Sequence, residues 1–483
     1  MDADQLDLKI TGHVVTPGRV LEDGWIGVRG EIIAGLGPAG SAAPAARQVI
    51  DARGQWILPG AVDAHVHCFS EPAEGFTNAT RAAAAGGVTT IIEMPYDADA
   101  PVVAGDVLDR KKDRLRREAV VDVALLGTIR KSGGLDAVGE LAAGGVCGFK
   151  ASMFETDPSR FPRIAHGELI ELFRRAAAAG LPVGLHAEDG EIIADALARW
   201  SAPPRPAAHC ATRPSVSETA AVAAALELAA ATGVHLHIYH ASLPRTFELV
   251  AGARAGGQLV TAETCPHYLL LSEDDMDRLG PFGKINPPLR PAAAARGLWD
   301  QVASGVVDMI TSDHSPWDIA KKSRPDDIFA NASGIPGVQT LLPLAYAGVV
   351  AGHGLPVLRL AELVAANPVR VFGLAPRKGQ LTAGADADLV VLDPAGTTRL
   401  HPGAMQSSAT WSPYHGMELS REEPVPADPA VGSVLAEAAD RTRRLCLRLS
   451  SHCPEEWTEP DDIAVCLAAL TAAVIRLDEE LAP

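Results

Sequence analysis

The chain has 483 residues, of which 47% are apolar and 21% charged, as expected for a globular protein with a large buried core. Lys and Arg number 42 and Asp and Glu number 60, so the formal net charge is -18. This acidic balance argues against nucleic acid or an anionic membrane as a partner, because both attract basic patches.

Features that direct a protein out of the cytoplasm are not visible in the sequence. The N-terminus has neither a basic n-region nor an apolar h-region, and no stretch approaches the roughly 18 apolar residues of a membrane-spanning helix. The 7 cysteines are odd in number and form no CxxC pair, which favours reduced thiols over a disulfide framework. We therefore expect a cytoplasmic protein with no membrane partner.

Short β-prone runs open the chain and return near residue 390. Leu8–Ile10, His13–Val15, Trp25–Val28 and Ile32–Ala34 are separated by turns rich in Gly and Pro, and Leu389–Leu392 repeats the pattern. The pattern predicts a small β-sandwich domain built from both chain ends, residues 1–56 and 376–420.

Residues 57–375 alternate short apolar runs with helical patterns rich in Ala and Leu. Val88–Met94, Val121–Leu126 and Val307–Ser312 are typical of buried strands, and residues 168–179 and 217–232 of helices between strands. Repeated β-α units over this length favour an α/β fold, a (β/α)8 TIM barrel. A doubly wound sheet is the alternative, although no G-x-G-x-x-G motif follows the first strand.

The composition changes again after residue 420. Glu422–Pro426 has the composition of a linker, and two helical patterns follow at about 430–450 and 460–481. We expect residues 421–483 to form a helical C-terminal extension, to which the sequence assigns no chemistry.

Ionisable residues at predicted strand ends indicate a metal site. In Gly60–His67, two histidines lie two residues apart on a predicted strand, so both imidazoles point to the same side. Strand ends of a β/α barrel meet at one face, where catalytic groups gather, and imidazole and carboxylate suit Zn2+. Taken singly, each residue has an ordinary structural explanation. A lone histidine is more often a hydrogen-bonded core residue, and a lone aspartate at a strand end is often a helix cap. The candidates are His65, His67, Lys150, His186, His240 and Asp313.

These residues, together with longer motifs, resemble the cyclic amidohydrolases, the group that contains dihydroorotase, allantoinase, hydantoinase and dihydropyrimidinase. The resemblance spans about residues 8–416, and its motifs lie at 80–90, 263–269, 284–290, 312–316, 333–339 and 412–414. It implies a homo-oligomeric enzyme, a dimer or tetramer, that hydrolyses C–N bonds of cyclic amides at a binuclear zinc centre.

The same resemblance implies a role for each ligand. One zinc ion would be held by His65, His67 and Asp313, the second by His186 and His240, and an N6-carboxylated Lys150 would bridge both. A bridging hydroxide would attack the amide carbon. Asp313 would accept its proton and deliver that proton to the leaving nitrogen.

Departures from the named members bear on the substrate. Ser70 stands where the dihydroorotase pattern has an Arg for the substrate carboxylate, and Trp317 replaces a His, so dihydroorotase is disfavoured. Glu155 replaces the Tyr that hydantoinases and dihydropyrimidinases place after the lysine. Allantoinase is the nearest resemblance, so allantoin is the first expected substrate. A hydantoinase, dihydropyrimidinase or cyclic imide hydrolase is the alternative.

The resemblance also implies substrate-binding residues: Met153, Glu155, Asn286, Trp317, Ser333 and Gly334. Asn286 and Ser333 would hold the amide edge of the ring, and Met153 and Trp317 would form an apolar wall. Glu155 either contacts a ureido or cationic group or is an exposed loop acid.

Outside enzymes, the alternative is a metal-free scaffold or regulatory homologue. The complete ligand set weighs against that alternative.

Overall fold

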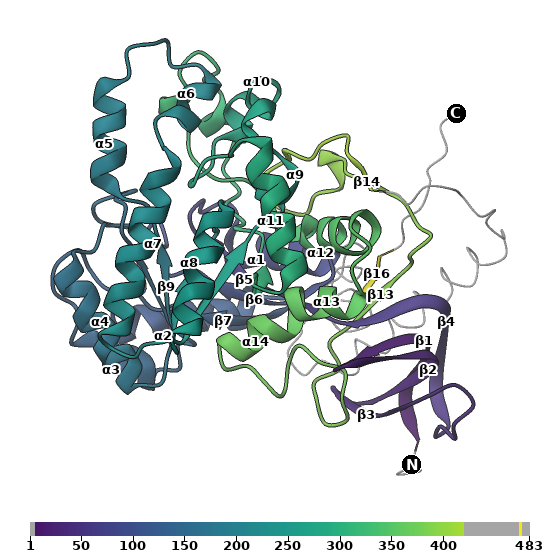
Figure 1. Ribbon diagram of the computed structural model, residues 1–483. Helices are drawn as coiled ribbons and strands as arrows, with labels where there is room; N and C mark the ends of the chain where they lie inside the picture. The colour runs from purple at the N-terminus through teal and green to yellow at the C-terminus, as the bar shows by residue number, and fades with distance from the viewer. Residues whose placement is uncertain (1–4, 420–472, 476–483) are drawn as a thin grey trace.

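Strands and helices alternate from residue 61 to residue 371 and build a barrel, as seen in the computed structural model, which describes residues 5–419 and 473–475 (Figure 1). Within that part of the chain, the barrel strands fall into a three-stranded and a five-stranded parallel sheet. The first sheet contains β5 (Ala61–Val66), β6 (Val88–Glu93) and β7 (Asp122–Leu125). The second contains β8 (Phe149–Ser152), β9 (Val183–His186), β10 (Leu236–Ile238), β11 (Val260–Thr264) and β12 (Met309–Ile310).

The two sheets join at both seams. Parallel bridges connect Gly127 with Phe149 and Val66 with His314, so the eight described strands close on themselves. The (β/α)8 barrel predicted from the sequence is confirmed.

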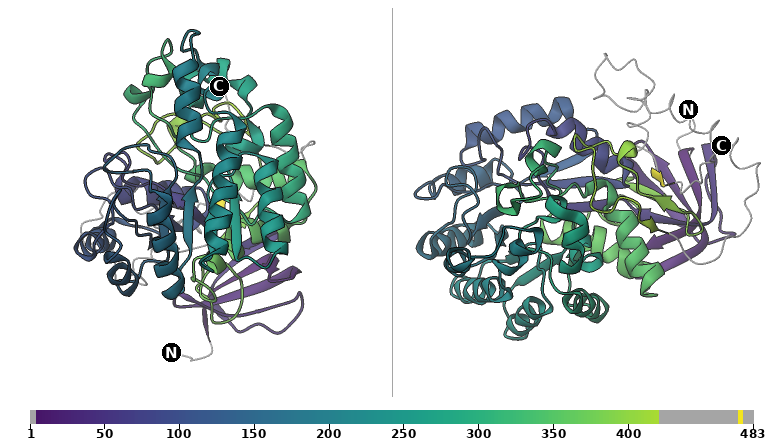
Figure 2. Two further views of the ribbon diagram at one scale, coloured as in Figure 1. Left: turned by 60° about the vertical axis from the view of Figure 1, so that its left-hand side comes forward. Right: turned by 90° about the horizontal axis from the view of Figure 1, so that it is seen from above.

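Helices cover the outside of the barrel, as the view from above in Figure 2 shows. α4 buries Leu169, Leu172, Phe173 and Ala176, which are spaced three or four residues apart and therefore share one face. The strands of β5, β6, β8 and β9 are buried at every position because the barrel interior and the helices cover both sides.

The helices of the barrel region have the following bounds: α1 (Gly75–Ala85), α2 (Gly105–Glu118), α3 (Ala137–Ala143), α4 (His166–Ala178), α5 (Gly190–Arg199), α6 (Pro206–Ala211), α7 (Ser215–Ala230), α8 (Pro244–Ala255), α9 (Pro266–Leu270), α10 (Met276–Leu279), α11 (Ala292–Ser304), α12 (Leu341–Tyr346), α13 (Val357–Ala361) and α14 (Asn367–Val371).

A separate six-stranded sheet lies beside the barrel and is drawn mainly in purple in Figure 1. Its six described strands have the order β16-β13-β4-β1-β2-β3. They are β1 (Leu6–Thr16), β2 (Arg19–Arg29), β3 (Ile32–Gly37), β4 (Ala46–Pro59), β13 (Leu389–Leu392) and β16 (Ala473–Ile475). Ile10, Val14, Ile26 and Ile33 are buried in its own apolar core.

Both chain ends contribute to this sheet, as predicted, but its first segment does not end at residue 56. β4 continues past residue 56 to Pro59 and leads through Gly60 directly into β5, so one extended segment connects the sheet to the barrel. The described strands form one mixed sheet, and the expected sandwich stays a prediction. A short pair, β14 (Thr398–Arg399) and β15 (Glu418–Leu419), lies apart from it.

Most of the expected helical extension lies outside the described residues. The exception is Ala473–Ile475, which forms β16 and pairs in parallel with β13. At these three residues the predicted helix is wrong. The edge of β13 offers unpaired backbone groups, and a short apolar, β-prone run satisfies them by adding a strand.

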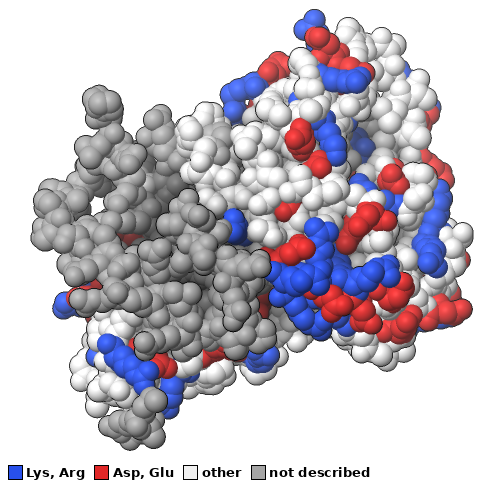
Figure 3. All heavy atoms as spheres, turned by 180° about the vertical axis from the view of Figure 1, so that it is seen from behind, with Lys and Arg blue, Asp and Glu red and all other residues white. Residues whose placement is uncertain are grey.

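Charged residues of both signs are interleaved over the surface of the described chain shown in Figure 3, and no broad area of one sign is seen on that face. Among the described helices, none combines the length and the apolar character needed to cross a membrane.

Close packing inside the barrel yields a first prediction. A Cβ at Gly184 on β9 would lie 1.8 Å from the Tyr239 ring, so Gly184→Ala forces that ring to move. We expect a destabilisation of about 1–3 kcal/mol, measured as a lower Tm. Gly167→Ala on α4 is the matched control, because a Cβ there has nothing within 4 Å. An unchanged Tm for Gly184→Ala would contradict this packing.

Candidate active site

His65 on β5, His67 directly after it and Asp313 after β12 form a compact group. His65 Nε2 lies 3.2 Å and His67 Nε2 3.6 Å from Asp313 Oδ1. All three side chains are buried, and one ligand atom from each lies within 4.8 Å of the others. Two imidazoles and a carboxylate in this arrangement can hold a divalent metal ion. The two-residue spacing on one strand therefore brings both histidines together, as predicted.

The backbone is strained at this group. Asp313 has a φ of 47° and His240, which follows β10, a φ of 39°. Non-glycine residues seldom adopt positive φ, and such strain collects at functional sites, where the surrounding structure enforces it. Both strained residues belong to the predicted ligand set.

The buried carboxylate of Glu263 on β11 contacts three histidines, of which His65 and His240 belong to the predicted ligand set. Its Oε1 lies 2.6 Å from His65 Nδ1 and accepts the backbone N–H of His240 at 3.1 Å. Its Oε2 lies 3.2 Å from His237 Nε2. A carboxylate on the second nitrogen of a histidine orients the ring toward a metal and raises its basicity. This role of Glu263 was not predicted from the sequence, although the residue opens the motif at 263–269.

Lys150 enters the same space from β8 and is fully enclosed. Its side chain is 1% exposed, and Nζ lies 3.4 Å from the centroid of the Tyr239 ring. Burial lowers the pKa of the Lys150 amine to about 7, although Glu263 and Asp313 oppose this change. A larger share of the amine is therefore neutral, and the neutral form is the nucleophilic one.

His186 and His240 face each other across the cavity. His186 Nδ1 lies 2.9 Å from His240 Nε2, while His186 Nε2 contacts Glu188 Oε2 at 2.9 Å. Arg213 holds Glu188 in turn with a contact of 2.6 Å. Burial lowers the pKa of both histidines, which favours the neutral, metal-binding imidazole. Glu188 and Arg213 were not recognised from the sequence.

One cavity of about 460 Å³ receives all six predicted ligand side chains: His65, His67, Lys150, His186, His240 and Asp313. Its volume suits a small-molecule site. Asn286 lines the cavity as well, and its Oδ1 is buried with no partner among the described residues. Such an acceptor can bind an N–H of a ligand.

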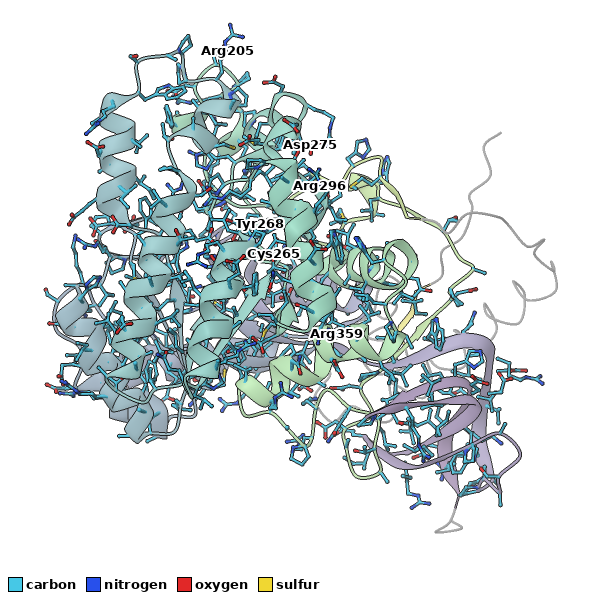
Figure 4. All side chains as sticks on the ribbon, viewed as in Figure 1. Arg205, Cys265, Tyr268, Asp275, Arg296 and Arg359 are labelled. Carbon is cyan, nitrogen blue, oxygen red and sulfur yellow. The ribbon has the colours of Figure 1, made fainter. Side chains whose placement is uncertain are left out.

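Two further segments shape the cavity around Asn286. Tyr268 on α9, labelled in Figure 4, donates its hydroxyl hydrogen to the Pro287 carbonyl at 2.7 Å and so fixes the loop that carries Asn286. Gly334 has a φ of 135°, and a Cβ there would lie 2.5 Å from Ser315 Cβ. Trp317 donates its Nε1–H to the Ser333 carbonyl at 2.7 Å, which closes this wall.

Of the remaining predicted substrate-binding residues, some line the cavity and one does not. Trp317, Ser333 and Gly334 line the cavity. Glu155 also lines it, but its carboxylate is paired with Lys131 at the rim. Met153 packs into the hydrophobic core and is absent from the described lining, so its predicted contribution to the apolar wall is wrong. β8 ends at Ser152, and after the bend that follows it Phe154 lines the cavity in its place.

Comparisons with known proteins agree with this geometry. A model of the amidohydrolase family matches residues 56–420. An allantoinase of Rubrobacter xylanophilus is 43% identical over 84% of this chain and 89% of its own length. A dihydroorotase of Halobacterium salinarum is 37% identical over 76% and 84%. The solved structure of an L-hydantoinase from Arthrobacter aurescens superimposes with a TM-score of 0.82 at 31% identity, covering 88% of this chain and 98% of that chain.

The contacts of Glu263 yield a second prediction. The Glu263 carboxylate oxygens now contact nitrogens of His65, His237 and His240. Glu263→Gln would replace one of these oxygens with an NH2 group, which cannot accept a hydrogen bond from them. We expect about 10- to 100-fold weaker zinc affinity, measured by competition with a chromogenic chelator. Glu248→Gln on α8, an exposed acid paired with Arg245, is the control. Equal zinc affinity in Glu263→Gln and the control would show that Glu263 does not support the site.

Proposed function

The chain belongs to the amidohydrolase family, and on that premise we propose that it hydrolyses a C–N bond of a cyclic amide or ureide, with allantoin as the first candidate. The observation that carries the proposal is that four histidines, an aspartate and a lysine at five barrel strands line one cavity beside the free acceptor of Asn286. The similarity to an L-hydantoinase structure makes hydantoin the second candidate.

The donor set fits two zinc ions. His65, His67 and Asp313 offer three ligand atoms within 4.8 Å of one another, and His186 and His240 bring two ring nitrogens together at 2.9 Å. Lys150 on β8 enters the same cavity. We propose that the first three residues hold one ion, that the two other histidines hold the second, and that Lys150 contributes to both.

Lys150 requires modification for this role, because an ammonium repels a cation. Carbon dioxide adds to the neutral Nζ and one amine proton leaves, which converts the amine into a carbamate with two anionic oxygens. The enclosed position of Lys150 against the Tyr239 ring supplies the neutral amine and shields the carbamate from water.

Bound zinc would acidify water to a nucleophile and polarise the amide carbonyl. The chain's own residues would then complete the reaction. Asp313 Oδ1 accepts the proton of the attacking water and returns it to the leaving ring nitrogen. Asn286 Oδ1 accepts a ring N–H, and the closed wall of Trp317 and Ser333 excludes water from one side of the substrate.

A side-by-side turnover assay tests the proposed function. The protein is loaded with zinc and bicarbonate and assayed on allantoin, hydantoin, dihydrouracil, dihydroorotate and succinimide. We expect hydrolysis of at least one of these rings and about two zinc ions per chain by elemental analysis, the count of a two-metal site. A preparation that stays metal-free and inert on all five rings would refute the enzyme assignment and favour the scaffold alternative.

Removal of the lysine amine tests the carbamate. We expect Lys150→Ala to lose activity and most of its zinc, and short carboxylates such as acetate or propionate to restore part of both. Lys112→Ala on α2 serves as the control, because Lys112 lies outside the cavity lining. Full activity in Lys150→Ala would contradict the bridging role.

A further inference from the structure

A guanidinium forms part of the cavity wall beside Trp317. Arg160 lies in the loop between β8 and α4, is half-buried and lines the same cavity as the ligand group. Its Nη1 donates to Ser70 Oγ at 3.2 Å and to the Tyr96 carbonyl at 3.0 Å. Ser70 Oγ in turn lies 3.3 Å from His67 Nδ1, so a single hydroxyl separates the guanidinium from the ligand group.

The loop holds Arg160 in a fixed position. Asp157 Oδ1 accepts the backbone N–H of Arg160 at 2.8 Å, and Asp157 and Phe161 exchange backbone hydrogen bonds across the turn. The Phe161 ring stacks on Tyr96 with centroids 3.7 Å apart. The Tyr96 backbone carbonyl accepts the guanidinium hydrogen bond, so the stacking and the hydrogen bond tie neighbouring loop residues, Phe161 and Arg160, to the same residue. A group so fixed loses little conformational entropy when a ligand binds.

The acids nearest to Arg160 have other partners. Asp97 pairs with Lys111 at 2.6 Å, and the Asp157 carboxylate accepts backbone N–H groups. Across the described chain, no carboxylate lies within ion-pair distance of Arg160, although Asp157 and Asp97 attract its charge from further away. The only described hydrogen bonds of the guanidinium are made by Nη1, which leaves Nε and Nη2 for a ligand. A partly buried charge without a direct ion pair is costly, and the free N–H groups can bind a carboxylate with two hydrogen bonds.

We propose that Arg160 determines substrate specificity by binding the oxygen acceptors of a substituent on the substrate ring, with a carboxylate preferred. This inference rests on the proposed function and adds the substituent that the ring carries. A ring whose amide reaches His67 and Asp313 presents its substituent to Arg160, beside Trp317, whose ring centroid lies 5.9 Å from the guanidinium. A ureido carbonyl offers a neutral acceptor at the same place and binds more weakly than an anion.

A matched pair of substrates tests the proposal. Dihydroorotate is dihydrouracil with an added ring carboxylate, and the ratio of their kcat/KM values isolates the contribution of that carboxylate. We expect Arg160→Met to lower this ratio by about 10- to 100-fold, the effect of losing hydrogen bonds to a charged group. Arg160→Lys, which keeps the charge but loses the fork, should give an intermediate ratio.

A second series separates the two acceptor types. The wild-type protein should favour 5-carboxymethylhydantoin over allantoin, and allantoin over hydantoin. Arg160→Met should reduce both preferences, so that the kcat/KM values for 5-carboxymethylhydantoin and allantoin fall toward the value for hydantoin. The control is Arg163→Met in the same loop, which removes an exposed guanidinium lying 3.9 Å from Glu191. That variant should keep the wild-type ratios.

Unchanged ratios in Arg160→Met would overturn the proposal, since a purely structural role of Arg160 lowers turnover of both rings alike. Calorimetric binding of dihydroorotate and dihydrouracil to the zinc-loaded protein gives a reading that needs no turnover. Equal affinity of the wild-type protein for the two rings would overturn the role of Arg160 while leaving the proposed function intact. Tighter binding of dihydroorotate without hydrolysis of any ring would refute the proposed function and support the subsite.

Discussion

The carboxylate of Glu263 is the contact on which the arrangement of the site depends. It is buried at the centre of the barrel, and it joins the end of β11 to His65 on β5 and to His237 and His240 at β10. β5 lies in the three-stranded sheet, whereas β10 and β11 lie in the five-stranded sheet, so one carboxylate sets the relative position of proposed ligands that the chain separates by more than a hundred residues. The barrel seam at Val66 and His314 then brings Asp313 against His65 and His67.

Around this carboxylate, the barrel interior combines an apolar enclosure with a few directed polar groups. Gly184 leaves room for the Tyr239 ring, and that ring lies against the Lys150 amine. The enclosure keeps the lysine away from water, while Glu188 and Arg213 hold His186 from the other side. Together these contacts explain how a lysine, which ordinarily carries a positive charge, can share a cavity with groups that bind cations.

The ligand positions were predictable from the sequence because they follow from regular geometry. Alternation along one strand places His65 and His67 on the same side, and parallel barrel strands bring Lys150, His186 and His240 to one face. Glu263, Glu188 and Arg160 were not predictable in this way, since their partners depend on the path of loops and on strand ends far apart in the sequence. The same reason accounts for Met153, which turns into the core after β8, and for β16, whose pairing with β13 no local pattern shows. The loss of an arginine at Ser70 argued against a carboxylated ring, yet the fold brings Arg160 to that serine from another loop.

The proposed hydrolysis requires two metal ions, for which we propose these six residues as ligands. A crystal structure of the zinc-loaded protein grown with bicarbonate, with anomalous data at the zinc edge, tests it most directly. We predict two anomalous peaks, one among His65, His67 and Asp313 and one between His186 and His240, with carbamate density on Lys150 between them. A single peak, peaks elsewhere, or an unmodified Lys150 amine would contradict the account.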